Sequence, residues 1–207
     1  MTQHDDQMTR LQRLHAETIL SVDSAARADL MQQAPCVLWF TGISAAGKST
    51  VANLVDRELH RRGHHTYLLD GDKVRHGLSR DLGFTDTDRT ENIRRVAEVA
   101  KLMLDSGLIV LVALISPFRS GREMARSLFE PSQFFEIHVD TPLEVAQQRD
   151  PKGLYRQANR GELHNVSGMD SPYEIPESPE VHIVTTELSR DECAQRVLDA
   201  LDAARGA

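Results

Sequence analysis

The sequence predicts an α/β protein in which helices cover both faces of a five-stranded parallel sheet, a three-layer α/β/α fold. Short apolar runs alternate with amphipathic helical patterns along most of the 207 residues, as in chains built from strand–helix–strand units. Residues 108–115 are apolar throughout, which is typical of a parallel strand buried on both faces. A glycine-rich loop, residues 42–50, joins the first apolar run to a helical pattern. Such loops lie at the carboxyl edge of parallel sheets.

Strands are expected where a short apolar run is bounded by glycine, proline or polar residues. The expected strands are 36–41, 66–69, 108–115, 134–139 and 181–185. Helices are expected where apolar residues recur every three or four positions. The expected helices are 48–62, 86–107, about 120–129, one opening at 141–144 and a last one opening at 189–192.

Helix starts and chain organisation follow from local patterns. Residues 1–34 are polar with weak helical spacing, so we expect two small helices outside the sheet and one domain over 35–207. Residues 150–180 are rich in glycine, proline, asparagine and charge, with no core periodicity.

Three pairs of residues suit caps at expected helix starts: Asp88 with Glu91, Thr141 with Glu144, and Ser189 with Glu192.

Composition restricts the partners. The net charge of −7 argues against a nucleic-acid or membrane-surface binder, because such proteins need a cationic face. Cys36 and Cys193 lie alone in apolar or helical stretches, which indicates buried thiols in a reducing compartment. No apolar run approaches membrane-spanning length, and the nine histidines show no metal-ligand spacing. We therefore expect a cytoplasmic protein.

The loop after the first strand has the spacing GxxxxGK[ST], which is typical of a phosphate-binding loop. Its backbone N–H groups would form an anion-sized nest at a helix N-terminus. Lys48 would reach the β- and γ-phosphates, and the Ser49 hydroxyl would bind Mg²⁺. The sequence therefore predicts binding of a nucleoside triphosphate together with Mg²⁺. The expected nucleotide-binding residues are Gly42, Ile43, Ser44, Ala45, Ala46, Gly47, Lys48, Ser49 and Thr50.

Asp70 and Asp72 follow the second strand. Two carboxylates there favour a kinase, since one can hold Mg²⁺ while the other accepts the proton of an acceptor hydroxyl. On an extended segment they would face the same side. We expect Asp72 to be the base and Asp70 the metal-side residue, although the order could be reversed. The alternative is that one of them merely caps a helix beginning near Lys73.

The loops after the first three strands should meet at one sheet edge. The phosphate loop, the two aspartates and Ser116 are therefore expected to share one crevice. Arg75, Arg89 and Asn92 gather around the start of the long helix. Residues 149–164 carry Arg149, Lys152, Arg156 and Arg160 among glycines, which favours a lid that closes over phosphates and excludes water.

These residues together resemble the adenylylsulfate kinase family. The resemblance runs from about residue 36 to 200. Its motifs are Leu69–Leu78, Asp81–Phe84, Asp88–Arg89, Glu91–Arg95, Ile115–Arg119, Val139–Glu144, Arg149–Tyr155 and Ser171–Glu174. It implies a P-loop kinase fold with a mobile lid at about 149–168. It also implies ATP-dependent phosphorylation of the 3′-hydroxyl of adenylyl sulfate, giving 3′-phosphoadenylyl sulfate and ADP in sulfate assimilation. Homodimers are common in this family.

The resemblance also implies roles for individual residues. Lys48, Asp70, Asp72 and Ser116 match catalytic positions, and Ser116 matches a serine that some descriptions of the family call a phosphoryl carrier. A structural serine at a strand end suits the residues equally well, because direct in-line transfer needs no relay. The implied acceptor-binding residues are Asp72, Arg75, Phe84, Arg89, Asn92, Ile115, Ser116 and Lys152, with Phe84 stacking on the adenine.

Three departures from the family pattern stand out. Ala45 and Ala46 replace glycine and serine in the loop, and Ala45 tolerates fewer backbone angles than glycine. Val166 stands where an aromatic residue often packs on the far side of the acceptor adenine, and Lys73 replaces a common asparagine. We expect an altered acceptor affinity with retained chemistry. The alternatives are a kinase of another small hydroxyl-bearing anion and a weakly active ATP-binding regulatory subunit.

Overall fold

The computed structural model describes residues 21–206 and contains one sheet of five parallel strands in the order β2-β3-β1-β4-β5. The fold is therefore α/β, as the sequence predicts, and every strand begins and ends within two residues of its expected bounds. The strands are β1 (Val37–Thr41), β2 (Thr66–Asp70), β3 (Ile109–Ala113), β4 (Phe134–Asp140) and β5 (Val181–Val184).

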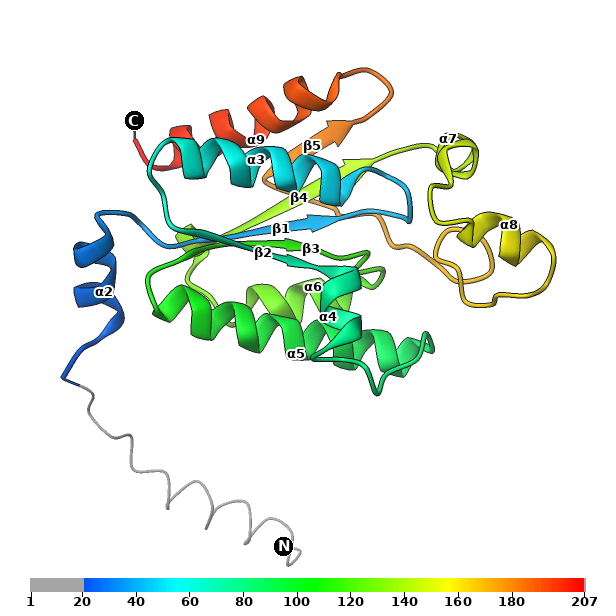
Figure 1. Cartoon of the computed structure of the whole chain (residues 1–207), viewed down its shortest axis with the longest axis horizontal. Coiled ribbons are helices and arrows are strands. Elements are labelled where there is room, and N and C mark those ends of the chain that lie inside the picture. The colour runs from blue at the N-terminus through cyan, green and yellow to red at the C-terminus, as the bar shows by residue number, and fades with distance from the viewer. Residues whose placement is uncertain (1–20, 207) are drawn as a thin grey trace, which may run out of the picture.

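Helices cover both faces of this sheet, with α3 and α9 on one side and α4, α5 and α6 on the other (Figure 1). Because all strands run in the same direction, the loops that follow β1, β2 and β3 meet at one edge of the sheet. The helices are α2 (Ser24–Met31), α3 (Lys48–Arg61), α4 (Gly71–His76), α5 (Asp86–Asp105), α6 (Arg119–Arg126), α7 (Leu143–Arg149), α8 (Leu154–Asn159) and α9 (Arg190–Ala204), with a 3₁₀ turn at Pro131–Gln133.

Two hydrophobic cores result from the alternation of side chains along the strands. One lies between the sheet and α3 and α9, and includes Phe40 and Leu111. The other lies between the sheet and α5 and α6, where Trp39 stacks on Phe134 with ring centroids 5.8 Å apart. β1 and β3 are buried along their whole length, so the central strands form a rigid base for the loops at their ends.

The segment before β1 is attached to the sheet through Gln33. Its side-chain NH₂ group donates to the carbonyl oxygens of His65 and Gly107, at 3.0 and 2.7 Å. Its Oε1 accepts from the backbone amide of His65 at 2.9 Å. Helix α2 is the second of the two helices expected before residue 35. The first lies outside the described residues, and the boundary at residue 35 stays a prediction.

Two of the expected caps are wrong. Helix α5 is capped by the Thr85 hydroxyl, which accepts from the Asp88 amide, while Glu91 instead forms ion pairs with arginines one turn on. The Thr141 hydroxyl does not cap α7, because it donates to the carbonyl oxygen of Ala46. The capping box of Ser189 with Glu192 at α9 is confirmed.

Residues 150–180 contribute more to the core than their composition predicts. Tyr155 on α8 and Val166 are 1% and 6% exposed, and both belong to the core beneath α3 and α9. The segment is therefore anchored at two points rather than lying on the surface throughout.

None of the helices described between residues 21 and 206 combines the length and apolarity that a membrane crossing requires.

Candidate active site

The loop between β1 and α3 has the backbone of an anion-binding nest. Gly42 and Gly47 have φ angles of 151° and 106°, and a Cβ atom on Gly42 would lie 2.4 Å from the Val139 carbonyl oxygen. Ala45 also has a positive φ, 58°, in the left-handed region that costs an L residue about 1–2 kcal/mol. This is how alanine fits where glycine is usual: the loop keeps its turn and alanine bears the strain.

The loop offers free donors at the start of α3. Within the described residues, the backbone amides of Ser44, Ala45 and Gly47 donate to no acceptor. Such unpaired amides at a helix N-terminus suit the oxygens of a phosphate group. The predicted nucleotide-binding segment therefore has the donors that a polyphosphate requires.

Lys48 lies at the base of this loop. Its side chain is 9% exposed, and Nζ donates to the Ile43 carbonyl oxygen at 2.7 Å. Burial, with the nearby charge of Lys152, lowers the pKa of Lys48 to about 7, although Asp70 and Asp72 act in the opposite direction. A phosphate placed beside it would restore the charged form, because an opposite charge at close range favours the ammonium.

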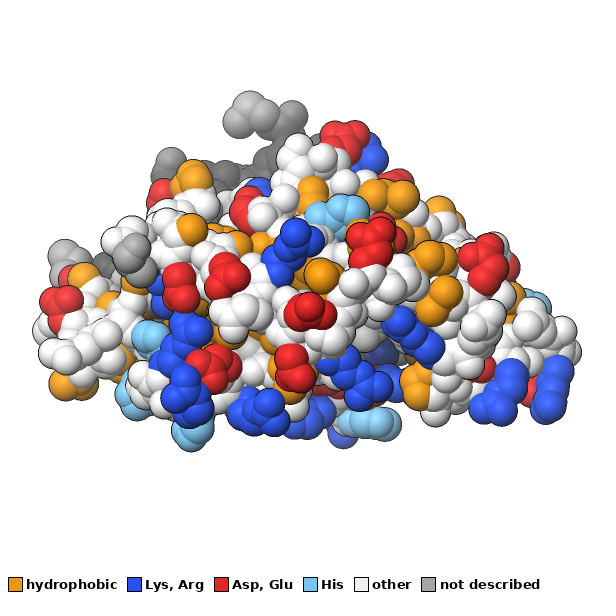
Figure 2. Space-filling model, turned by 90° about the horizontal axis from the view of Figure 1, so that it is seen from above, with side chains coloured by type: hydrophobic (Ala, Val, Ile, Leu, Met, Phe, Trp, Pro, Cys, Tyr) orange, Lys and Arg blue, Asp and Glu red, His pale blue; other side chains and the backbone are white. Residues whose placement is uncertain are grey.

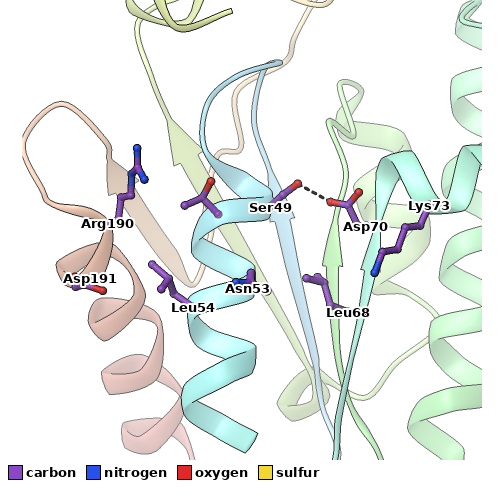
Figure 3. Close-up of a pocket in the computed structure, with 9 residues that line it drawn as sticks. Ser49, Asn53, Leu54, Leu68, Asp70, Lys73, Arg190 and Asp191 are labelled. Atoms are coloured by element: carbon purple, nitrogen blue, oxygen red, sulfur yellow. Dashed lines mark hydrogen bonds between the residues drawn. The ribbon is translucent and has the colours of Figure 1, made fainter. Parts of the chain in front are cut away.

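Ser49 and Asp70 face each other across the ends of α3 and β2 (Figure 3). The Ser49 hydroxyl donates to Asp70 Oδ2 at 2.6 Å. A hydroxyl and a carboxylate are oxygen ligands of the kind that Mg²⁺ prefers, usually together with waters and phosphate oxygens. The donor set therefore fits the predicted metal site. A cleft of about 510 Å³ opens beside this pair, with Lys73 on one side and Arg190 on the other.

Contrary to the expectation from the sequence, Asp70 and Asp72 do not lie on one extended segment. Asp70 ends β2 and caps α4, its Oδ1 accepting from the Asp72 amide at 3.1 Å. The alternative that one aspartate caps a helix is therefore correct for Asp70, whose carboxylate also accepts from the Ser49 hydroxyl. Asp72 lies in the first turn of α4, and its carboxylate forms an ion pair with Lys152 from the predicted lid.

The acceptor-side residues form a group between α4 and α5. Phe84 is 49% exposed, and the Arg75 guanidinium lies 4.5 Å from its ring centroid. Arg75 donates to the Gly83 carbonyl oxygen at 2.8 Å. Arg89 is buried and donates to the carbonyl oxygens of Phe84, at 3.0 Å, and of Asn165. An exposed ring with an arginine at its side suits a flat, anionic ligand.

Asn92 lies one turn after Arg89 on α5 and is 4% exposed. Its Oδ1 has no hydrogen-bond partner among the residues that the structure describes. A buried acceptor without a donor costs about 1–3 kcal/mol, so an unpaired group of this kind calls for a reason. A hydroxyl or amino group of a bound ligand would supply the missing donor.

Ser116 does not present its side chain to the crevice. It is 2% exposed, its hydroxyl accepts from Trp39 Nε1 at 3.0 Å, and its φ is 46°. Its carbonyl oxygen accepts from buried Arg122 at 2.7 Å. The neighbouring Ile115 carbonyl oxygen accepts from the Thr41 hydroxyl at 2.7 Å, which ties this backbone to the end of β1. These contacts favour the structural interpretation of Ser116.

The predicted lid contacts the phosphate loop through Tyr155 and through Arg149, which donates to the Ala46 carbonyl oxygen at 3.4 Å. The Tyr155 hydroxyl donates to the Ser44 carbonyl oxygen at 2.9 Å. Arg149 donates to the hydroxyl of Thr185, at 3.1 Å, and to its carbonyl oxygen. Tyr155 ends the motif Arg149–Tyr155 but has no role assigned from the sequence, and nothing in the spacing indicates Thr185. Arg156 and Arg160 lie on the exposed side of α8.

Val166 is buried in the core beneath α3 and α9. The carbonyl oxygen of the preceding residue, Asn165, accepts from Arg89. The expected place of Val166 on the far side of the acceptor adenine stays a prediction. On the face of the molecule that carries α3 and α9, acidic and basic side chains are interspersed rather than gathered into one basic surface (Figure 2). This agrees with the net charge of −7.

Comparisons with known proteins identify relatives of this chain. The family model described as adenylylsulphate kinase matches residues 34–184. The bifunctional enzyme NodQ of Rhizobium sp. (strain BR816) is 64% identical over 166 residues, which cover 80% of this chain and 26% of that protein. An adenylyl-sulfate kinase of Marinobacter nauticus is 55% identical, covering 86% of this chain and 89% of the relative. The chain thus spans about a quarter of NodQ and most of the Marinobacter protein.

Among solved structures, the APS kinase CysC of Mycobacterium tuberculosis in complex with AMPPNP and APS is similar to this chain. Its TM-score is 0.78 at 47% identity, and the match covers 81% of this chain and 98% of that one. The range that the family model matches, residues 34–184, includes the phosphate loop, both aspartates and the predicted lid.

We predict that Ala45→Gly stabilises the protein, because glycine adopts a φ of 58° without the strain that alanine bears. The free energy of unfolding should rise by about 0.5–1 kcal/mol in urea unfolding experiments. Ala46→Gly is the matched control: Ala46 is fully buried and has no positive φ, so this change should lower stability. Equal losses in both variants would contradict the prediction.

We also predict that MgATP binding takes up a proton at pH 8. With its pKa near 7, Lys48 is mostly neutral at this pH, and the phosphates restore its charge. Calorimetry in buffers of different ionisation enthalpy should show uptake of roughly one proton per nucleotide. Lys48→Arg, which is always charged, should show none. Heats that do not depend on the buffer in the wild type would refute this.

Proposed function

The chain belongs to the adenylylsulphate kinase family, and on this premise we propose that it transfers the γ-phosphoryl group of ATP to the 3′-hydroxyl of adenylyl sulfate. The products are 3′-phosphoadenylyl sulfate and ADP, in sulfate assimilation. The observation that carries this proposal is the contact between Ser49 and Asp70 at 2.6 Å. Because Asp70 precedes the helix that bears Asp72, this contact supports a phosphate donor in the loop that lies beside Asp72 as the base.

The donor side of the proposal rests on the loop. The free amides of Ser44, Ala45 and Gly47 and the Lys48 ammonium would bind the β- and γ-phosphates. Ser49 and Asp70 would hold Mg²⁺, which when bound neutralises charge that develops on the phosphate oxygens. Tyr155 links the lid to the Ser44 carbonyl oxygen in the phosphate loop, and Arg149 links it to Thr185. Movement of the lid would therefore change the surroundings of the bound nucleotide.

The acceptor side rests on the group between α4 and α5. Phe84, which is 49% exposed, would stack on the adenine. Arg75 and Arg89, whose guanidinium groups lie 4.5 and 5.8 Å from its ring centroid, would bind the phosphosulfate. Asn92 Oδ1 would accept a hydrogen bond from a ribose hydroxyl, which would satisfy the buried atom. The alternative acceptors considered from the sequence, small sugar acids for example, would leave Phe84 without a stacking partner.

The chemical step needs one base. The Asp72 carboxylate accepts the proton of the 3′-hydroxyl as the oxygen attacks the γ-phosphorus, and the bond to the β-bridging oxygen breaks to release ADP. Lys152 pairs with Asp72, so it must move its ammonium to the acceptor's anionic group before Asp72 can accept a proton. Ser116 has no part in this step, because its hydroxyl is buried and bonded to Trp39.

We further propose a homodimer in a reducing, cytoplasmic setting. Cys36 and Cys193 are both buried and free, and burial raises the pKa of Cys36 to about 11, which keeps it an unreactive thiol. The homodimer follows from the family resemblance.

A coupled assay of ADP release tests the proposed function. With MgATP, adenylyl sulfate should give turnover, whereas gluconate and other hydroxyl-bearing anions should give rates close to the ATPase background. Mass spectrometry of the product should show one phosphoryl group added to adenylyl sulfate. Turnover with another acceptor but not with adenylyl sulfate would overturn the assignment of substrate, and no turnover with any acceptor would favour a regulatory role.

Asp72→Asn tests the base. The amide cannot accept the proton in the transition state, so kcat should fall about 100-fold or more while both KM values change little. Asp199→Asn, an exposed carboxylate change on α9, is the control and should leave kcat unchanged. An undiminished kcat in Asp72→Asn would assign the base elsewhere.

A further inference from the structure

His138, Asp140 and His182 form a cluster outside the candidate active site. His138 and Asp140 are two residues apart on β4, and His182 lies directly opposite His138 in the register of β4 with β5. Alternation along the two strands places all three side chains on the same face of the sheet. One ligand atom from each residue lies within 4.8 Å of the others.

The geometry within the cluster is compact. His182 Nε2 lies 3.0 Å from Asp140 Oδ2, and the two imidazole rings stack with centroids 5.0 Å apart. Tyr173 stacks on the other side of His138, at 6.0 Å. His138 is 4% exposed, whereas Asp140 and His182 are partly open to solvent. The cluster therefore has a fixed inner ligand and two outer ligands that solvent can reach.

The inner imidazole, that of His138, has no competing partner. Neither of its ring nitrogens donates to or accepts from another residue in the described part of the chain. An imidazole nitrogen with a free lone pair is the commonest metal ligand among protein side chains.

We propose that His138, Asp140 and His182 bind a borderline divalent transition-metal ion of the Zn²⁺ type, with solvent in the remaining position. Two imidazoles and one carboxylate are ligands that suit zinc and its neighbours, whereas Mg²⁺ prefers oxygen ligands alone. The predicted Mg²⁺ residue Asp70 ends β2, at the opposite edge of the sheet from β5. The two ions would therefore bind independently.

Binding requires one adjustment. The imidazole planes are 8° from parallel, so one ion cannot lie in both planes until a ring turns about its χ2 bond. The His182 side chain is 51% exposed, which leaves room for that rotation, and terminal torsions of this kind are soft. The ion would then link the edge strand β5 to β4, whose end carries Thr141 and its hydrogen bond to the phosphate loop.

Metal titration of the full chain without nucleotide tests this proposal. Zn²⁺ should bind with a stoichiometry of one in calorimetry, with excess Mg²⁺ present, and Co²⁺ should give the visible absorption of a nitrogen- and oxygen-coordinated ion. Wild-type protein should also melt at a higher temperature with Zn²⁺ than with Mg²⁺ alone.

His182→Ala and Asp140→Asn should each weaken Zn²⁺ binding at least ~10-fold and abolish the Co²⁺ spectrum. Both side chains are partly exposed, so the variants should fold, which circular dichroism would verify. His164→Ala is the matched control, because His164 is also an exposed histidine near a carboxylate, 3.8 Å from Asp170. The proposal is overturned if the wild type binds no Zn²⁺, or if His182→Ala and His164→Ala bind it equally.

Discussion

The carboxylate of Asp70 joins the two halves of the candidate site. Oδ2 accepts from Ser49 on the first turn of α3, and Oδ1 accepts from the Asp72 amide at the start of α4. One side chain thus fixes the distance between the loop that would hold the phosphate donor and the helix that would hold the base. In-line transfer depends on that distance, because catalysis of phosphoryl transfer is mostly positioning.

A second set of contacts, centred on Arg122, holds the backbone that follows β3. Arg122 is buried and donates to the carbonyl oxygens of Ser116 and Glu174, and its Nε lies 2.6 Å from Glu136 Oε1. A buried pair of this kind adds little net stability, but removing one partner is costly. Its contribution is therefore positional: it holds the backbone after β3 in a left-handed turn at Ser116.

The sequence predicted the parts of the fold that depend on local pattern. Strand positions and the phosphate loop follow from apolar runs and glycine spacing, which are properties of neighbouring residues. The dual role of Asp70, the link from Tyr155 to Ser44 and the pairing of His138 with His182 depend on which strands become neighbours. Spacing along the chain contains no information on such contacts. For the same reason the nine histidines show no metal pattern in the sequence.

Charged groups of the site have partners within the chain. Lys48 bonds to the Ile43 carbonyl, Asp72 to Lys152, and Arg75 to the Gly83 carbonyl. A substrate must exchange these contacts for its own. Folding has already buried Lys48, whereas the Asp72 and Lys152 side chains are 60% and 53% exposed and lose water only when a ligand binds. The donors and acceptors left unpaired, the loop amides and Asn92 Oδ1, are uncharged. Ligand affinity should therefore come mainly from hydrogen bonds to these uncharged groups. The charged residues should discriminate between ligands, because a ligand must offer groups that can replace their present partners.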